Sequence, residues 1–414
     1  MNDSLQQLMR DATRLTRAGR LDEATDAIQR ALRGQSATPA ASSREPPIPE
    51  VDVQPKSGGV TFDASATVPG GNVFEVFTGD DDAAETDFAA AESVCDEGLH
   101  APSPYAREEV NSDIPADHED GTFTSGTHTH LSKTLSYKLY APPGQALRPL
   151  PLVVMLHGCT QHPDDFAAGT GMNVAAHEQG FYVLYPAQSQ AANASRCWNW
   201  FQPNDQQRGR GEPALIASMT ETVIQQHNID PRRVYIAGLS AGGAMATIVA
   251  EAYPEIFAAV GVHSGLPRGA ANNVMEAFTV MQNGDAAAPI TGIDMQMSVP
   301  TIVFHGDQDQ TVHPRNGERL IEAVLSGDGA DEWQMSAGGS PRIERGTSAK
   351  GRRYTRSTYV DDNGNAMLEH WLIHGAGHAW AGGHASGTYT DAKGPDATKE
   401  MLRFFMVHPR TRVR

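Results

Sequence analysis

The sequence predicts an α/β fold with a mostly parallel, doubly wound sheet and helices on both of its faces. From about residue 123 onward, short and almost wholly apolar runs, such as LPLVVMLHG over 150–158 and FYVLYPA over 181–187, alternate with helical segments. Apolar runs of this length are typical of strands buried on both faces, and their alternation with helices indicates a parallel sheet. In such sheets the chemistry lies at the carboxyl ends of the strands.

Residues 1–34 precede this region and read as two short amphipathic helices that are broken near Gly19. We expect a small helical hairpin that acts as a tether. The alternative is a module that docks a protein partner or a storage granule. A repeat array is not expected, because one hairpin lacks the neighbours against which repeats bury their faces.

Residues 35–120 are rich in Pro, Ser, Gly, Ala and acidic side chains, which predicts a disordered acidic linker in which NVFEVF alone resembles a short strand. The chain has a net charge of −18, and 14 acidic residues stand against one basic residue between Asp80 and Asp120. Most of the net negative charge therefore lies in this one segment. The rest of the chain lacks the basic stripe that a nucleic-acid surface needs, so we expect no nucleic-acid partner.

No run of about 18 apolar residues is present, so we expect no membrane-spanning helix. The N-terminal stretch lacks the basic region, apolar run and cleavage site of a secretory signal. We therefore expect a cytoplasmic protein, while secretion by another route stays open.

The predicted catalytic domain covers residues 121–410, and its elements follow one another as a doubly wound sheet requires. Alternating apolar and polar residues predict a half-exposed strand over 135–143. We expect buried strands over 150–158, 181–187, 234–240, 257–265 and 300–309, and helices over 171–180, 211–228 and 241–255. The stretch 368–383 runs from a last strand into a Gly-rich loop.

Ser240 lies between a predicted strand and a predicted helix, within GLSAG over 238–242. Glycines two residues on either side of a serine allow a tight turn that projects the hydroxyl from the sheet, and the next amide, that of Ala241, can stabilise an oxyanion. The motif favours a nucleophile, with a purely structural turn as the alternative.

A serine nucleophile needs a general base and an acid that orients it. The segment HGDQDQTV supplies Asp309 in an H-G-x-x-D-x-x-V pattern, and Asp307 is the alternative that caps a turn. In the Gly-rich loop, His378 is the better candidate for the base. His374 lies four residues before it, but the intervening glycines argue against a helical pair of metal ligands, and we expect no metal or other cofactor.

The loop after the strand at 150–158 reads HGCTQ and fits the second half of an oxyanion hole. We expect its amide donor to be that of Cys159 or Thr160. Cys159 as a nucleophile is the alternative, but no His or Asn pattern surrounds it. Substrate contacts are expected from Gln161 and from three tryptophans that could instead pack in the core, namely Trp198, Trp200 and Trp380.

A basic, Gly-rich stretch over 339–357 is expected to be a solvated loop, with a flap as the alternative. The dipeptide Asn363-Gly364 that follows it predicts a hairpin turn.

Five blocks in order, VMLHGCTQ, CWNWF, VYIAGLSAGGAMA, HGDQDQTV and HGAGHAWAGG with GTYTDAKGPDA, resemble the polyhydroxybutyrate-depolymerase-like esterases, which are related to feruloyl and acetyl xylan esterases. The resemblance covers about residues 123–408. It implies an α/β-hydrolase fold and ester hydrolysis by Ser240, Asp309 and His378. It also implies a disulfide between Cys159 and Cys197, which are paired in secreted relatives and which a cytoplasmic location would leave reduced.

The expected substrate is a 3-hydroxyalkanoate oligomer or polyester, or a short acyl or aryl ester. One alternative is a feruloyl or acetyl esterase acting on polysaccharide fragments. The other is a non-catalytic binding protein on a hydrolase scaffold.

Overall fold

The computed structural model describes residues 121–144, 147–284, 299–326 and 340–410. They all belong to the unit Tyr105–Arg414. The helical hairpin predicted over 1–34, the acidic linker predicted over 35–120 and the strand-like run NVFEVF lie outside the described residues. The described residues therefore all belong to the predicted catalytic domain.

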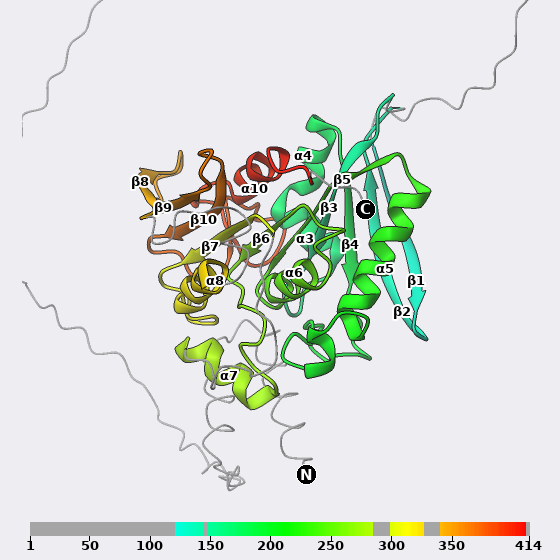
Figure 1. Ribbon diagram of the computed structural model, residues 1–414, viewed down its shortest axis with the longest axis horizontal. Helices are drawn as coiled ribbons and strands as arrows, with labels where there is room; N and C mark the ends of the chain where they lie inside the picture. Colours follow the sequence, from blue (N-terminus) through cyan, green and yellow to red (C-terminus); the bar gives the residue numbers. More distant parts are fainter. Residues whose placement is uncertain (1–120, 145–146, 285–298, 327–339, 411–414) are drawn as a thin grey trace, which may run out of the picture. The chain divides into compact units, whose positions relative to one another are not determined.

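A ten-stranded sheet crosses this domain in the order β1-β2-β4-β3-β5-β6-β7-β10-β9-β8 (Figure 1). Its central strands, from β4 to β10 in that order, run parallel to one another, whereas β1, β2, β9 and β8 pair antiparallel at the two edges. The strands are β1 (Thr122–His130), β2 (Lys133–Ala141), β3 (Leu150–Leu156), β4 (Tyr182–Ala187), β5 (Ile229–Leu239), β6 (Ala259–His263), β7 (Thr301–Gly306), β8 (Arg342–Thr347), β9 (Arg353–Val360) and β10 (Ala366–Ile373). This is the mostly parallel α/β-hydrolase sheet that the sequence predicts.

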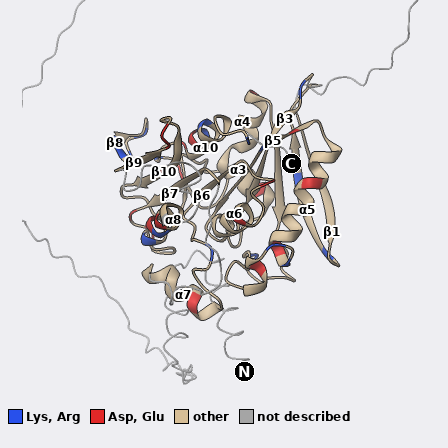
Figure 2. Ribbon diagram, in the orientation of Figure 1, with Lys and Arg blue, Asp and Glu red and all other residues tan. Residues whose placement is uncertain are grey.

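Helices cover both faces of the sheet because alternate side chains of each central strand point to opposite sides. On β3, Leu152 and Val154 face one core and Val153 and Met155 face the other. The first core is closed by α5 (Gly211–Gln226), α6 (Ala241–Ala252), α7 (Val274–Asn283) and α8 (Arg315–Ser326), and the second by α3 (Pro163–Thr170), α4 (Met172–Gln179) and α10 (Ala397–Met406). The strands β3, β4, β6 and β7 carry no Asp, Glu, Lys or Arg, and Figure 2 draws them in tan. The active-site edge is thus held between two apolar layers.

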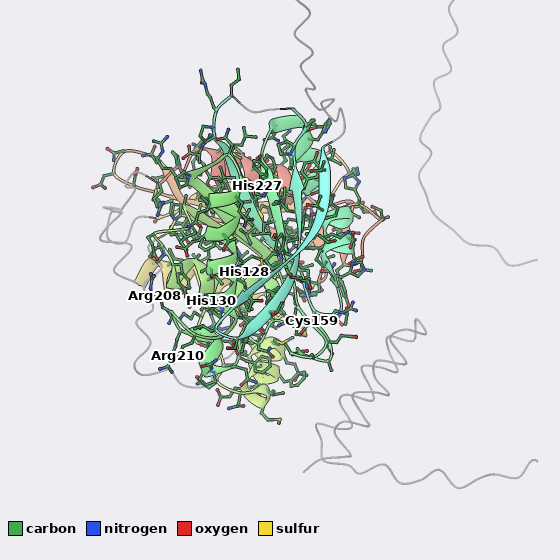
Figure 3. The ribbon with its side chains drawn as sticks, turned by 90° about the vertical axis from the view of Figure 1, so that its right-hand side faces the viewer. His128, His130, Cys159, Arg208, Arg210 and His227 are labelled. Atoms are coloured by element: carbon green, nitrogen blue, oxygen red, sulfur yellow. A yellow bond between two sulfur atoms is a disulfide. The ribbon has the colours of Figure 1, made fainter. Side chains whose placement is uncertain are left out.

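The antiparallel edge formed by β1 and β2 lies against α5, as the side view in Figure 3 shows. The His128 ring nitrogen Nε2 lies 3.0 Å from the Ser218 hydroxyl on α5. The two strands are joined by Leu131 and Ser132, which both have positive φ angles, as the primed two-residue hairpin turns require.

The basic stretch over 339–357 is not the loop that the sequence predicts. It forms β8 and the first part of β9, which extend the sheet beyond β10. The side chains of β8 are almost all exposed, so this edge strand lacks the apolar alternation by which a strand is identified. The predicted hairpin turn at Asn363-Gly364 is confirmed, because it joins the antiparallel strands β9 and β10 and Gly364 has a φ of 82°.

Two short elements complete the described part of the fold. The β11 strand (Trp380–Ala381) pairs with β12 (Thr390–Asp391), and a short 3₁₀ turn, η1 (Pro203–Gln206), precedes α5. Within the described ranges, none of the helices combines the length and the apolar character needed to cross a lipid bilayer.

Candidate active site

Ser240 occupies the sharp turn between β5 and α6, and its backbone is strained. Its φ and ψ angles are 58° and −122°, which side chains with a Cβ rarely adopt. The flanking glycines are required by close packing. A Cβ on Gly238 would overlap the backbone of Gly242, and a Cβ on Gly242 would overlap the carbonyl oxygen of Leu156. The turn therefore has the backbone geometry of a nucleophile elbow.

The predicted acid and base are joined directly. The Nδ1 atom of His378 lies 2.7 Å from Oδ2 of Asp309, and the other carboxylate oxygen accepts the amide hydrogens of Thr311 and Val312, each at 2.9 Å. Although burial alone would raise the pKa of Asp309, the hydrogen bonds and charges of His305 and His378 lower that pKa well below its usual value. Asp309 is thus an ionised acceptor that fixes the His378 ring and leaves Nε2 available as a base.

Asp307 forms a second pair with His374 instead. Its carboxylate lies 2.9 Å from Nδ1 of His374 and accepts the amide hydrogen of Gly375 at 2.7 Å. The two aspartates and two histidines therefore separate into two couples, and the structure brings His378 together with Asp309 rather than with Asp307. The Asp307 pair anchors the beginning of the loop that carries His378.

His263 connects the turn that carries Ser240 to the loop that carries His378. Its carbonyl oxygen accepts the Ser240 amide at 2.9 Å, and its ring Nε2 accepts the Ala381 amide at 3.0 Å. Burial is the main cause that lowers the pKa of His263 to about 3, so the ring is neutral. Because Nε2 accepts, the remaining proton is on Nδ1, which lies 3.2 Å from the Ser264 hydroxyl. No hydrogen bond joins Ser240 to His378 among the described residues, as is common before a substrate binds.

The oxyanion loop, residues 157–161, lies beside the nucleophile. A methyl group added to Gly158 would come 3.6 Å from the Cβ of Ser240. Ala241 is the first residue of α6, and the amides of the first helical turn have no partner inside the helix. Within the described part of the chain, the amide of Cys159 makes no hydrogen bond. Ala241 and Cys159 therefore keep amides that could stabilise an oxyanion.

Thr160 does not fit the predicted role of an oxyanion donor. Its amide already donates to the carbonyl oxygen of Ser195 at 2.6 Å, and its φ is 67°. The amide is consequently used to hold the loop, and the donor prediction is corrected in favour of Cys159.

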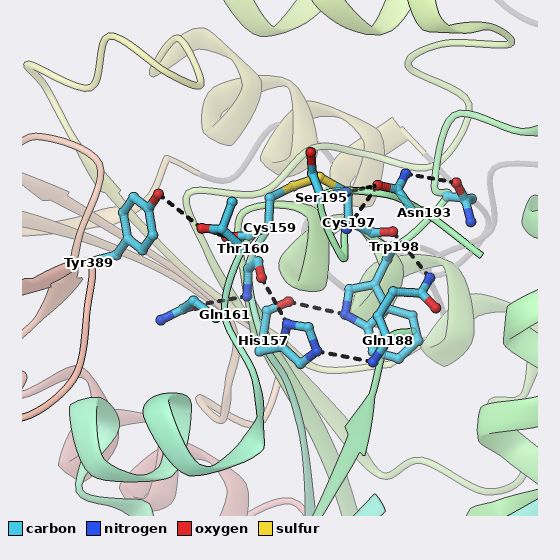
Figure 4. The surroundings of a disulfide bond; sticks show 12 residues. His157, Cys159, Thr160, Gln161, Gln188, Asn193, Ser195, Cys197, Trp198 and Tyr389 are labelled. Atoms are coloured by element: carbon cyan, nitrogen blue, oxygen red, sulfur yellow. Dashed lines mark hydrogen bonds between the residues drawn. A yellow bond between two sulfur atoms is a disulfide. The ribbon is translucent and has the colours of Figure 1, made fainter. Parts of the chain in front are cut away.

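A disulfide joins Cys159 to Cys197, with Cα atoms 4.2 Å apart (Figure 4). It ties the oxyanion loop to the segment that begins after β4. Next to it, the indole nitrogen of Trp198 donates to the carbonyl oxygen of His157 at 3.1 Å. The pairing that the family resemblance implies is thus present in the structure, whereas the cytoplasmic location stays a prediction.

The four residues expected to contact substrate lie within the fold. Trp198, Trp200, Trp380 and Gln161 are at most 4% exposed. The indole of Trp380 donates to the Thr398 hydroxyl at 3.0 Å and stacks on His263. The Gln161 side chain accepts the Gly158 amide and donates to Asp165. The expected substrate role is therefore corrected, because these side chains pack in the core or brace the oxyanion loop.

Tyr389, which the sequence interpretation did not select, does reach the site. Its hydroxyl lies 3.2 Å from the Thr160 hydroxyl (Figure 4). Its ring meets that of His378 edge to face, with the ring centroids 6.3 Å apart. The segment GTYTD belongs to a block that resembles the esterase family, but nothing in its pattern marks the tyrosine as a site residue.

Comparison with known proteins agrees with this geometry. The family model described as esterase PHB depolymerase matches residues 135–342, half of the chain. Poly(3-hydroxyalkanoate) depolymerase C of Paucimonas lemoignei is 35% identical over 240 residues, which are 55% of this chain and 54% of that protein. Feruloyl esterase B of Thermothelomyces thermophilus is 30% identical over 203 residues, which are 44% of this chain and 67% of that protein. The chain thus spans about half the length of the first of these relatives.

Among solved structures, an acetyl xylan esterase from Aspergillus awamori superposes with a TM-score of 0.53 and 19% identity, over 68% of this chain and 99% of that one. At this identity the likeness supports the α/β-hydrolase fold alone. The family match includes Ser240, Asp309 and both bonded cysteines, while His378 lies beyond its last residue. The chain belongs to the esterase PHB depolymerase family of carboxylic ester hydrolases.

Proposed function

We propose that this protein is a serine esterase that hydrolyses carboxylic esters through an acyl-enzyme on Ser240. One observation carries the proposal. The strained turn at Ser240 and the Asp309–His378 pair lie at the same carboxyl edge of the sheet and are bridged by the buried His263. This is where catalytic groups are found in such sheets.

The steps follow from the geometry. The Ser240 hydroxyl attacks the ester carbonyl while Nε2 of His378 takes its proton, and Asp309 stabilises the charged imidazole that forms. The amides of Ala241 and Cys159 donate to the oxyanion. His378 then returns the proton to the leaving alcohol and activates a water molecule, which releases the acid and frees Ser240. These steps need no metal or organic cofactor.

We infer that the substrate is a 3-hydroxyalkanoate oligomer or polyester, or a short acyl or aryl ester. The family description and the depolymerase relative support this class. A feruloyl or acetyl esterase acting on polysaccharide fragments is the second candidate, which the feruloyl esterase relative favours. Docking of a protein or granule through residues 1–34 and a cytoplasmic location remain predictions.

The test is hydrolysis of p-nitrophenyl acetate, butyrate and octanoate by the wild type and by Ser240→Ala. We expect wild-type turnover that falls by about 10⁵-fold or more in the variant, as removal of a serine nucleophile does in other hydrolases. Release of 3-hydroxybutyrate from its linear trimer, compared with ferulate from methyl ferulate, then separates the two substrate classes. Equal background rates in both proteins would contradict the proposal and leave a non-catalytic binding protein.

A further inference from the structure

Tyr389 is an exposed aromatic residue at a site whose tryptophans are all buried. It is 41% exposed, whereas Trp198, Trp200 and Trp380 are at most 4% exposed. It lies at the end of the loop that leads from β11 to β12. Core packing therefore explains little of why a large ring stands here.

The ring lies between two parts of the proposed machinery. Its hydroxyl contacts the hydroxyl of Thr160 on the oxyanion loop, 229 residues away in the sequence, at 3.2 Å. The Tyr389 ring meets the His378 ring edge to face, with the centroids 6.3 Å apart and an angle of 79° between the ring planes. Figure 4 shows Tyr389 directed at Thr160 from outside the loop. A group bound between the oxyanion amides and the general base would meet this ring.

The backbone at Tyr389 is strained, with a φ of 52°. The strain is imposed from both sides. The carbonyl oxygen of Tyr389 accepts the Trp380 amide at 2.7 Å, and the preceding Thr388 accepts from Gln161 and donates its amide to Asp165. Glycine would adopt this conformation without steric strain. A tyrosine held in it at a candidate site points to a functional reason for the side chain.

The other strained residues support this interpretation. Apart from the β1–β2 hairpin, positive φ angles of non-glycine residues in the described ranges occur at Thr160, Arg196, Ser240, Ser264 and Tyr389. Thr160 lies in the oxyanion loop and Arg196 precedes the bonded Cys197, while Ser240 is the nucleophile and Ser264 follows His263. Tyr389 is the fifth. Strain is thus concentrated around the proposed site, as it is at functional sites in general.

We propose that Tyr389 is a specificity-determining residue whose ring forms the wall against which the alcohol portion of the ester packs. The alcohol side is favoured because the ring lies next to His378, which must reach the leaving oxygen to protonate it. The hydroxyl, held by Thr160, keeps the ring over the site. The preferred alcohols are then apolar or aromatic. This inference rests on the proposed esterase function.

The test uses two acetate esters that differ in the alcohol alone, benzyl acetate and methyl acetate. We expect Tyr389→Gly to lower the benzyl-to-methyl ratio of kcat/KM by about tenfold or more, the usual loss when an apolar contact is removed. Tyr389→Phe keeps the ring but loses the contact with Thr160, so the ratio should fall by less than in Tyr389→Gly. The melting temperature of Tyr389→Gly should not fall, because glycine relieves the positive φ.

The matched control is Leu131→Gly. Leu131 also has a positive φ, 49°, and an exposed side chain, but it lies in the β1–β2 hairpin. This variant should leave the benzyl-to-methyl ratio unchanged. An unchanged ratio in Tyr389→Gly, or a fall in its melting temperature without a change in ratio, would overturn the inference and make Tyr389 a structural residue. No hydrolysis of either ester by the wild type would instead overturn the proposed function itself, and this inference with it.

Discussion

His370, on β10, is a half-buried histidine whose Nε2 atom is itself buried and has no hydrogen-bond partner in the described part of the protein. Burial, with a smaller effect of His305, lowers its pKa to about 4. His157 and His263 behave alike, since burial lowers their pKa values to about 4 and about 3. These rings are neutral in the folded protein but take a proton near pH 6.5 when unfolded. The contribution of these neutral rings to the free energy of unfolding is therefore fully present above pH 6.5 and is lost as the pH falls toward 4.

We predict that His370→Phe weakens the loss of stability in acid. Between pH 7 and pH 5 the wild type should lose more unfolding free energy than the variant, by about 1–2 kcal/mol, because the variant has one histidine fewer whose pKa is lowered by folding. Urea unfolding at the two pH values measures the difference. His177→Phe is the control, since His177 lies on the exposed side of α4 and should follow the wild type. Parallel losses in wild type and His370→Phe would contradict the prediction.

At the scale of elements, the oxyanion loop is a short segment. It is held in place by contacts with residues outside the loop. The disulfide to Cys197, the bond from the Thr160 amide to Ser195 and the bonds from the Gln161 side chain to Asp165 and Thr388 all restrain it. The proposed donor, the amide of Cys159, belongs to the residue that carries the disulfide. Preorganisation of such a donor contributes most to catalysis when it does not move during the reaction.

We predict that Cys197→Ala lowers kcat for a short ester by about tenfold or more, with a smaller effect on KM. The expected loss is below the ~10²–10³ that follows from removing an oxyanion donor outright, since the amide is retained but less fixed. The variant should also melt at a lower temperature, because the bond joins residues 38 positions apart in the sequence. Activity is measured well below both melting temperatures.

The sequence has three cysteines, and Cys95, the third, lies outside the described residues. Cys95→Ala is the matched control for this experiment, because it leaves the Cys159–Cys197 bond in place. It should behave as the wild type, and denatured wild-type protein without reductant should show one free thiol. A Cys197→Ala variant with wild-type kcat would contradict the proposed part of the disulfide in catalysis.

At the scale of the whole molecule, the buried centre of the fold could be predicted and its edge and site walls could not. Strands such as β3 and β7 must be apolar on both faces, so their sequences reveal them. The β8 strand is exposed almost throughout and forms by pairing with β9, which leaves no apolar pattern to detect. The contacts of His263 and Tyr389 join residues 118 and 229 positions apart, and no local pattern encodes them.

The candidate triad was predictable because its residues occur in motifs at strand ends in the order Ser, Asp, His. The aromatic walls were not, since a tryptophan can pack in a core or line a pocket with the same local sequence. Trp198 and Trp380 pack in the core, where their indole nitrogens have hydrogen-bond partners inside the fold.

The most direct test of the central claim compares Asp309→Asn with Asp307→Asn. Both carboxylates accept from a histidine and lie two residues apart, but only Asp309 is paired with His378. We predict that Asp309→Asn lowers kcat for p-nitrophenyl butyrate by about 10³-fold or more, because the imidazole loses its orientation and its stabilising charge. Asp307→Asn should stay within about tenfold of wild type. Equal losses in the two variants, or a larger loss in Asp307→Asn, would contradict the assignment of Ser240, His378 and Asp309 as one catalytic unit.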